Sequence, residues 1–259
     1  MAWVLDLDGV MWLGDQPIYG SADAVARLRA NSQRVVFLTN NSSLTVGDYV
    51  AKLRNMGVPV EESDVVTSAQ AAASMLSPSS TALVCAGKGV DEALQRRGVR
   101  TVRSGRADAV VVGWHREFDF DRLTAAYRAV ASGARLIGTN DDATYPTPTG
   151  LLPGGGAILA AVSYATGKPA EVAGKPFKAM VGLVKERVGR VEVVVGDKAS
   201  TDGALARNLG ARFILVLSGV TDQDDLPVDP APDLVANDLA AAVTTWLAQP
   251  APTPQQQSQ

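Results

Sequence analysis

Short apolar runs alternate with helical segments along nearly the whole chain, and this alternation constrains the fold most strongly. The runs are rich in β-branched residues, which is typical of strands buried on both faces. They predict strands at Trp3–Leu5, Val35–Leu38, Ala82–Cys85, Ala109–Val112, Leu136–Ile137, Val191–Val195, Phe213–Leu217 and Leu234–Val235. Four predicted helices end at a glycine, as helices often do: Gly57, Gly98, Gly133 and Gly210. The pattern predicts an α/β fold with a mostly parallel sheet flanked by helices.

A change in composition at residues 76–80 predicts a linker between two structural units. The following segment, up to about Gly167, has its own strand–helix pattern and ends with a helix announced by Pro153 and three glycines. We therefore predict a core from residues 1–78 and 169–248, with a smaller α/β domain inserted at residues 79–168. The tail, residues 249–259, has no apolar face to bury, so it is predicted to be disordered.

The overall composition predicts a cytoplasmic, soluble protein. Hydrophobic residues make up 46% of the 259 residues, which is enough for a sizeable core, and the net charge of −3 favours neither nucleic acid nor an anionic membrane as a partner. The single cysteine, Cys85, cannot form an internal disulfide. No apolar stretch reaches the length of a membrane span, and Asp6 and Asp8 interrupt any signal-peptide pattern.

Two carboxylates, Asp6 and Asp8, follow the first predicted strand, and Gly9 allows a sharp turn after them. Residues two positions apart on an extended backbone point to the same side. Burying carboxylates at a strand end is costly unless a cation or hydrogen bonds offset the cost. The pair therefore suits a site where one carboxylate attacks, the other moves a proton, and a metal ion lies nearby. Taken alone, the pair fits a turn or a helix cap equally well.

A second polar segment, Thr39-Asn40-Asn41-Ser42, follows the second predicted strand. A hydroxyl and a run of backbone amides at such a junction can hold phosphate oxygens. Asn and Ser are also common helix caps, and the segment alone favours that simpler interpretation.

Lys175 lies between Gly174 and Pro176, a residue type that often begins a helix. Most lysines are solvated surface charges. A lysine fixed at a helix start is different, because the helix dipole disfavours a cation there. This placement indicates an anionic partner for Lys175.

The strand Val191–Val195 is followed by Asp197 and Asp202. Asp197 follows its strand as Asp6 follows the first one, so the two can share a hard cation through oxygen ligands. Asp202 is either a further ligand, direct or through water, or the N-cap of a helix at residues 204–209.

These four segments, in this order, resemble the motifs of the haloacid dehalogenase superfamily of aspartate-nucleophile phosphatases, and the resemblance covers nearly the whole chain. The insert resembles the α/β cap of the NagD-like, p-nitrophenylphosphatase branch, as do the loop at residues 138–146 and the segment at residues 150–154. Within the branch, the chain is most similar to glycerol-3-phosphate and phosphoglycolate-type phosphatases. The resemblance implies a Rossmann-like parallel-sheet core with an inserted cap.

The resemblance also implies roles for three acidic residues. Asp6 is the nucleophile that forms an aspartyl-phosphate, and Asp8 protonates the leaving group and then deprotonates the hydrolytic water. Mg²⁺ is held by a carboxylate oxygen of Asp6, the backbone carbonyl of Asp8, and Asp197.

The phosphoryl group has its own set of implied ligands. Thr39, Asn40 and Asn41 form the loop that binds its oxygens, and Lys175 neutralises both the nucleophile and the transferring group. Positioning and cationic charge are what phosphoryl transfer requires.

Four cap residues are expected to set substrate preference: Trp114, His115, Asn140 and Asp142. His115 stands where relatives more often carry an aspartate, although a lone histidine is more often structural. Ser200 stands where relatives often carry a charged residue, but metal binding is expected to survive because Asp197 and Asp202 remain.

The sequence therefore predicts an Mg²⁺-dependent phosphatase that acts on a small phosphorylated metabolite such as glycerol phosphate, phosphoglycolate, a nucleotide or a sugar phosphate. A non-catalytic protein that binds phosphometabolites and a phosphotransferase are the alternatives. Cysteine phosphatases, zinc hydrolases and P-loop enzymes are excluded by the surroundings of Cys85, the single histidine and the missing GxxxxGK[ST] loop. The resemblance further implies that two copies pair as a homodimer.

Overall fold

Six parallel strands form the central sheet of the computed structural model, which describes residues 2–147 and 150–248. Their order across the sheet is β15-β14-β13-β1-β4-β5. In the register, Leu5 of β1 lies beside Phe37 of β4 and Val195 of β13. The strands are β1 (Ala2–Asp6), β4 (Arg34–Thr39), β5 (Val65–Thr67), β13 (Val191–Gly196), β14 (Arg212–Val216) and β15 (Leu234–Ala236).

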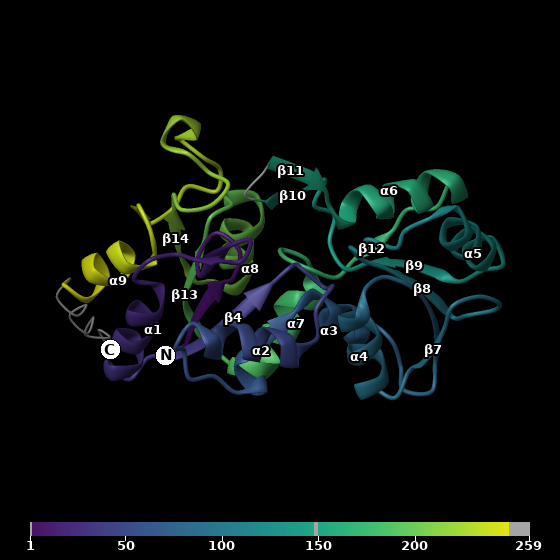
Figure 1. Cartoon of the computed structure of the whole chain (residues 1–259), viewed down its shortest axis with the longest axis horizontal. Helices are drawn as coiled ribbons and strands as arrows, with labels where there is room; N and C mark the ends of the chain where they lie inside the picture. The colour runs from purple at the N-terminus through teal and green to yellow at the C-terminus, as the bar shows by residue number, and fades with distance from the viewer. Residues whose placement is uncertain (1, 148–149, 249–259) are drawn as a thin grey trace, which may run out of the picture.

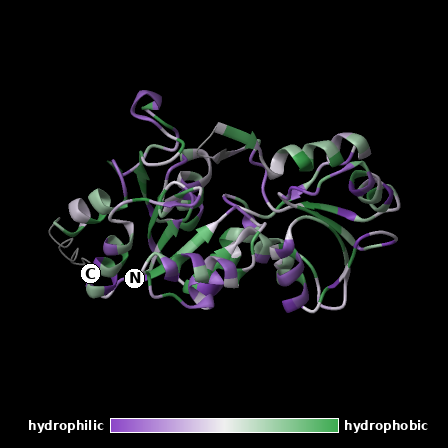
Figure 2. Ribbon diagram, viewed as in Figure 1, coloured by the Kyte–Doolittle hydropathy of each residue, from purple (hydrophilic) through white to green (hydrophobic). Residues whose placement is uncertain are grey.

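Helices cover both faces of this sheet, because alternate strand residues point to opposite sides. In β1, Trp3 and Leu5 belong to one buried cluster and Val4 to another. The first face packs against α1 (Ser21–Ala30), α2 (Val46–Asn55) and α9 (Leu239–Leu247). The second face packs against α3 (Ser68–Ser74), α7 (Lys178–Val188) and α8 (Ala204–Leu209). The strands of the central sheet are accordingly largely hydrophobic (Figure 2), and the helices bury apolar residues against them.

A second lobe is built on a five-stranded parallel sheet with the order β12-β9-β8-β6-β7 (Figure 1). These strands are β6 (Thr81–Cys85), β7 (Arg100–Val102), β8 (Ala109–Val112), β9 (Arg135–Gly138) and β12 (Glu171–Val172). The helices α5 (Phe120–Ala131) and α6 (Gly155–Thr166) pack on one face, and α4 (Lys88–Arg96) packs on the other. We call this lobe the cap.

Two short hairpins and three short helical turns complete the described chain. The hairpin β2 (Trp12–Leu13) with β3 (Gln16–Pro17) follows the first core strand, and the hairpin β10 (Thr144–Thr147) with β11 (Gly150–Pro153) projects from the cap. Figure 1 shows β10 and β11 above the gap between the two sheets. The turns are η1 (Glu62–Asp64), η2 (Ala199–Gly203) and η3 (Gln223–Asp225).

One buried apolar cluster extends through both lobes. It joins Val36 and Leu38 of the central sheet to alanines of α3, then to Val90 and Leu94 of α4 and to Val84 of the cap sheet. Separating the lobes at this point would expose apolar surface to water, which is unfavourable. The cap is therefore attached to the core by packing as well as by the chain connections.

The predicted fold class is confirmed, and each predicted strand is present. The glycines expected after helices all have positive φ angles, from +69° at Gly210 to +104° at Gly133, which is the left-handed conformation that glycine adopts at little cost. The short strands β5, β7 and β12 were not predicted, since two or three residues give little periodic signal.

The domain boundaries remain predictions, and β12, which pairs with β9, lies beyond residue 168. The predicted disorder of residues 249–259 falls outside the described residues. Across residues 2–147 and 150–248, none of the helices has both the length and the apolar character needed to traverse a bilayer.

Truncation of the shared cluster should weaken the whole fold. Leu38 has no solvent exposure, so Leu38→Ala is expected to lower the free energy of unfolding by about 2–5 kcal/mol. Leu151→Ala is the matched control, because Leu151 is 67% exposed, and it should change stability by less than about 0.5 kcal/mol. Chemical denaturation followed by circular dichroism measures both, and equal effects would contradict the assignment of Leu38 to the core.

Candidate active site

A cavity of about 460 Å³ lies at the carboxyl ends of β1, β4 and β13, where the cap faces the core. Ligands bind at this edge in open parallel sheets, because loops from several strands meet there. The core contributes Asp6, Asp8, Thr39, Asn40, Asn41, Lys175, Asp197, Lys198, Thr201, Leu13, Gly219 and Val220 to the lining. The cap contributes Trp114, Asn140, Asp142, Thr144, Tyr145, Thr147, Leu151, Gly154 and Gly155.

Lys175 lies at the centre of the buried charges. Its Nζ is 2.8 Å from Asp6 Oδ1 and 2.7 Å from Asp202 Oδ1, and the lysine is only 2% exposed. Burial by itself lowers the pKa of an ammonium, but the carboxylates of Asp202 and Asp6 raise the pKa of Lys175 above its usual value. Lys175 is therefore charged, and the anionic partners expected from the sequence are these two aspartates.

The structure corrects the helix start expected near Lys175 and excludes one of the two alternatives left open for Asp202. Helix α7 begins at Lys178, not at Pro176, because Phe177 still has an extended backbone at the N-cap. Asp202 is not a helix cap, since Gly203 occupies the N-cap of α8 and the Asp202 side chain bonds Lys175 instead.

Gly9 and Gly219 form a narrow backbone cradle around Asp197, in which a residue with a side chain would overlap its carboxylate. A Cβ atom built on Gly9 would lie 2.1 Å from Asp197 Oδ2, and one on Gly219 would lie 1.8 Å from the same atom. That oxygen accepts a hydrogen bond of 2.8 Å from the backbone N–H of Val220. The glycines thus allow the backbone to close around this carboxylate and fix its direction.

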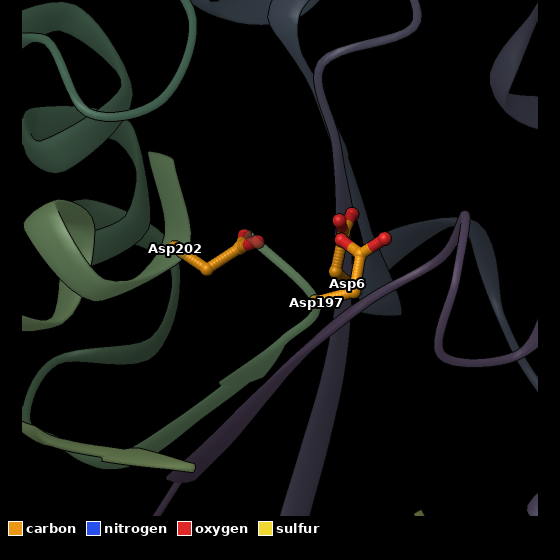
Figure 3. Close-up of side chains that lie close together, drawn as sticks. All are labelled: Asp6, Asp197 and Asp202. Atoms are coloured by element: carbon orange, nitrogen blue, oxygen red, sulfur yellow. The ribbon is translucent and has the colours of Figure 1, made fainter. Parts of the chain in front are cut away.

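Asp6, Asp197 and Asp202 form a cluster in which one carboxylate oxygen of each residue lies within 4.8 Å of one oxygen of the other two (Figure 3). Three carboxylates against the one ammonium of Lys175 leave an excess of negative charge. Burial raises the pKa of Asp6 well above its usual value despite Lys175, and burial together with Asp202 raises the pKa of Asp197 to about 7. A hard divalent cation with oxygen ligands would remove this excess, so the residues fit a metal site of the magnesium type.

Asp8 occupies a different environment from Asp6. Its Oδ1 accepts hydrogen bonds from Trp12 Nε1 at 3.0 Å and from the Tyr145 hydroxyl at 3.4 Å. Burial raises its pKa, which the Trp12 bond opposes in part. A carboxyl group with a raised pKa is suited to donating and accepting a proton.

The segment Thr39–Ser42 forms a loop, so the helix-cap interpretation that its residue types favour is wrong: α2 begins at Val46 and is capped by Thr45. Thr39 Oγ1 accepts from the Asn41 N–H at 3.0 Å, which leaves the hydroxyl hydrogen for another acceptor. Asn40 Oδ1 accepts from the Lys175 N–H at 2.7 Å. This loop is therefore held directly against the Lys175 segment.

Three of the four expected cap residues face the cavity. Trp114 packs against Tyr145 with ring centroids 5.6 Å apart, and Asn140 Nδ2 donates to the Asn40 carbonyl at 2.8 Å. Asp142 also lines the cavity, whereas His115 is not part of the lining. His115 is buried in the cap against Phe118, and burial lowers its pKa.

Lys198, Tyr145 and Gly219 line the cavity, but the sequence did not single them out. Lys198 directly follows Asp197, and Tyr145 lies in the family-like loop at residues 138–146. The position of each in the sequence therefore indicated that it lies near the site. Gly219 follows an apolar strand, and glycines are so common in the turns after strands that this one gave no sign of a cradle.

The comparisons with known proteins agree with this geometry. Residues 3–100 match a family model described as haloacid dehalogenase-like hydrolase, and residues 172–242 match a second HAD-hydrolase-like model. An acid sugar phosphatase from Staphylococcus epidermidis is 34% identical over 93% of this chain and 96% of that protein. A D-glycerol 3-phosphate phosphatase from Mycobacterium tuberculosis is 35% identical over 91% of this chain and 69% of that protein.

Solved structures show the same likeness. The glycerol phosphate phosphatase from Mycobacterium tuberculosis in complex with magnesium superposes with a TM-score of 0.87 at 34% identity, covering 98% of this chain and 79% of that one. A p-nitrophenyl phosphatase from Archaeoglobus fulgidus gives 0.84 at 30% identity, covering 94% and 98%. The chain belongs to the haloacid dehalogenase-like hydrolase family, in the branch that the sequence resemblance indicated.

Filling the glycine cradle should disable the site. In Gly219→Ala the new methyl group would overlap Asp197 Oδ2, so this carboxylate must move, and hydrolysis of p-nitrophenyl phosphate is expected to fall at least about tenfold. Gly182→Ala is the control, because a Cβ on Gly182 meets no atom within 4 Å and the residue lies within helix α7. Undiminished activity of Gly219→Ala would contradict the assigned role of the cradle.

Proposed function

We propose that this protein is an Mg²⁺-dependent phosphatase that hydrolyses a small phosphorylated metabolite through an aspartyl-phosphate. One observation carries the proposal: the Asp6 carboxylate, the Lys175 ammonium, the Asp8 carboxyl group and the Asp197 carboxylate all border one cavity. A nucleophile, a proton carrier and balanced charge around one phosphorus atom are what phosphoryl transfer requires.

The reaction has two steps, and Asp6 and Asp8 act in both. In the first, an Asp6 carboxylate oxygen bonds to phosphorus as the bond to the ester oxygen breaks, and Asp8 gives its proton to the leaving alkoxide. In the second, Asp8 takes a proton from a water molecule whose oxygen attacks the aspartyl-phosphate. Inorganic phosphate leaves, and the Asp6 carboxylate is restored.

The remaining residues orient the phosphoryl group. Lys175, held between Asp6 and Asp202, places its positive charge beside the nucleophile. The Thr39 hydroxyl and the backbone N–H of Asn40 would bind phosphoryl oxygens, while the Asn41 N–H donates to Thr39 Oγ1 and holds that hydroxyl in place. Asn41 itself is fixed by bonds to Ser43 N–H at 3.0 Å and Ser43 Oγ at 2.7 Å.

Mg²⁺ would be held by Asp6, by Asp197 and by the backbone carbonyl of Asp8, with Asp202 supporting them through Lys175 and the Lys198 N–H. When bound, it supplies positive charge that neutralises phosphoryl oxygens. The excess of negative charge in the cluster supports this assignment, as does the magnesium complex of the mycobacterial relative.

The substrate is proposed to be a small ester such as a glycerol phosphate or a sugar phosphate. The cavity of about 460 Å³ has room for a small metabolite, and residues of the cap line one side of it. Relatives named acid sugar phosphatase and D-glycerol 3-phosphate phosphatase support the same class. Action in the cytoplasm and pairing of two copies as a homodimer belong to the proposal as well.

A phosphotransferase built on the same residues is the second candidate function. It would pass the phosphoryl group from Asp6 to an alcohol instead of water. Adding glycerol or glucose at increasing concentration to a p-nitrophenyl phosphate assay separates the two. Release of inorganic phosphate equal to that of p-nitrophenol supports hydrolysis, and a phosphate deficit that grows with the alcohol supports transfer.

Loss of the nucleophile should abolish turnover. Asp6→Asn keeps the shape of the side chain but cannot attack phosphorus, so kcat is expected to fall below about a thousandth of the native value. Asp15→Asn removes a fully exposed carboxylate and should leave kcat unchanged. Steady-state assays over a panel of glycerol and sugar phosphates measure both, and a substantially active Asp6→Asn would refute the assignment.

Activity should depend on the divalent ion and on Asp197. Removal of metal by EDTA is expected to stop hydrolysis, and added Mg²⁺ should restore it. In Asp197→Asn, the Mg²⁺ concentration for half-maximal rate should rise at least about tenfold, because a charged ligand is lost. Full activity in EDTA, or an unchanged Mg²⁺ requirement in Asp197→Asn, would contradict the proposed metal site.

A further inference from the structure

One carboxylate of the cap, Asp142, contacts two separate loops of the core. Its Oδ1 accepts from Lys198 Nζ at 2.6 Å, and its Oδ2 accepts from Asn40 Nδ2 at 3.1 Å. Asn40 lies in the loop after β4, and Lys198 lies in the loop after β13. Asp142 therefore connects the two core loops to each other across the cavity edge.

Asn40 is held on its other sides as well. Its Oδ1 accepts from the Lys175 N–H at 2.7 Å, and a Cβ on Gly174 would lie 2.5 Å from that oxygen. Its backbone carbonyl accepts from Asn140 Nδ2 at 2.8 Å. Asn40 Nδ2 also donates to the Lys175 carbonyl at 3.3 Å, so both backbone groups of Lys175 hold the amide. The second Nδ2 hydrogen is left for Asp142, whose carboxylate completes the hydrogen bonding of the Asn40 side chain.

Lys198 is tied to the acidic cluster by its neighbours in the chain. It follows Asp197 directly, and its backbone N–H donates to Asp202 Oδ2 at 3.2 Å. The Asp142 side chain is 21% exposed and the Lys198 side chain 41%. An ion pair with this partial exposure contributes little to stability by itself. Its main effect is to orient the loop that carries Lys198.

We propose that Asp142 is a positioning residue for the phosphoryl site. It acts through Asn40 on the loop that binds the phosphoryl oxygens, and through Lys198 on the loop that carries Asp197. This inference rests on the proposed function. It also differs from the sequence expectation that Asp142 selects among substrates, because the groups it orients serve the phosphoryl group that every substrate shares.

The first test compares substitutions at two neighbouring carboxylates of the same loop. Asp142→Ala is expected to lower kcat about 10–100-fold, since small misplacements of reacting groups cost this much. Asp141→Ala is the matched control, because Asp141 is exposed and does not line the cavity, and it should stay within about twofold. Circular dichroism melting confirms that each variant is folded.

The substrate dependence of the loss separates positioning from selection. The fall in kcat of Asp142→Ala should be the same for p-nitrophenyl phosphate, glycerol 3-phosphate and glucose 6-phosphate, with smaller changes in KM. A loss confined to one ester, or carried by KM alone, would overturn the proposal in favour of a specificity role.

A double-mutant cycle tests whether Asp142 acts through Lys198. Asp142→Asn and Lys198→Met each break the ion pair, so the double variant should be no worse than the more impaired single variant. Losses in kcat that multiply in the double variant would overturn the coupling.

Phosphate affinity gives a readout that does not depend on turnover. Isothermal titration calorimetry with inorganic phosphate and Mg²⁺ should give about tenfold weaker binding for Asp142→Ala than for the native protein. If the native protein binds phosphate but hydrolyses none of the esters, the proposed function fails. The difference in phosphate affinity between the native protein and Asp142→Ala then still tests whether Asp142 positions the phosphoryl site. Equal phosphate affinity in the two proteins, or no phosphate binding to the native protein, would overturn the inference.

Discussion

The buried ammonium of Lys175 is the interaction on which the site depends. It lies between Asp6 at the end of β1 and Asp202 after β13, so it joins strands that are far apart in the sequence. Removing a partner from a buried ion pair leaves an uncompensated charge, which is strongly destabilising. Three carboxylates within 4.8 Å exceed what a single ammonium can neutralise. The same arrangement that stabilises the folded site therefore also creates its affinity for a further cation.

The strand ends are the part of the site that the residues alone could predict. Asp6, Thr39 and Asp197 each follow an apolar run, and parallel strands place such residues at one edge of the sheet. The helix boundary near Pro176 was misplaced, since local residue preferences do not fix where a helix begins once tertiary contacts hold the preceding segment. The residue types of Thr39–Ser42 favoured a helix cap because Asn and Ser are common caps, but the next helix is capped by Thr45 instead.

Contacts between the lobes were beyond the reach of the sequence. The partners of Asp142 lie 102 and 56 residues away in the chain, and no periodicity links positions at such separations. The placement of His115 away from the cavity likewise depends on how the cap sheet packs against α5, not on the residue type. Side-chain chemistry indicated which residues act, and the fold determined which of them meet.

The apolar cluster that runs from the central sheet through α3 and α4 into the cap has a mechanical consequence. A wide rotation of the cap would break this cluster and hydrate its surface, which opposes large-amplitude opening. The hairpin β10–β11 contributes Tyr145 and Leu151 to the cavity wall. Sequence change in that ribbon can alter the wall around a ligand while the chemical centre beneath it stays the same.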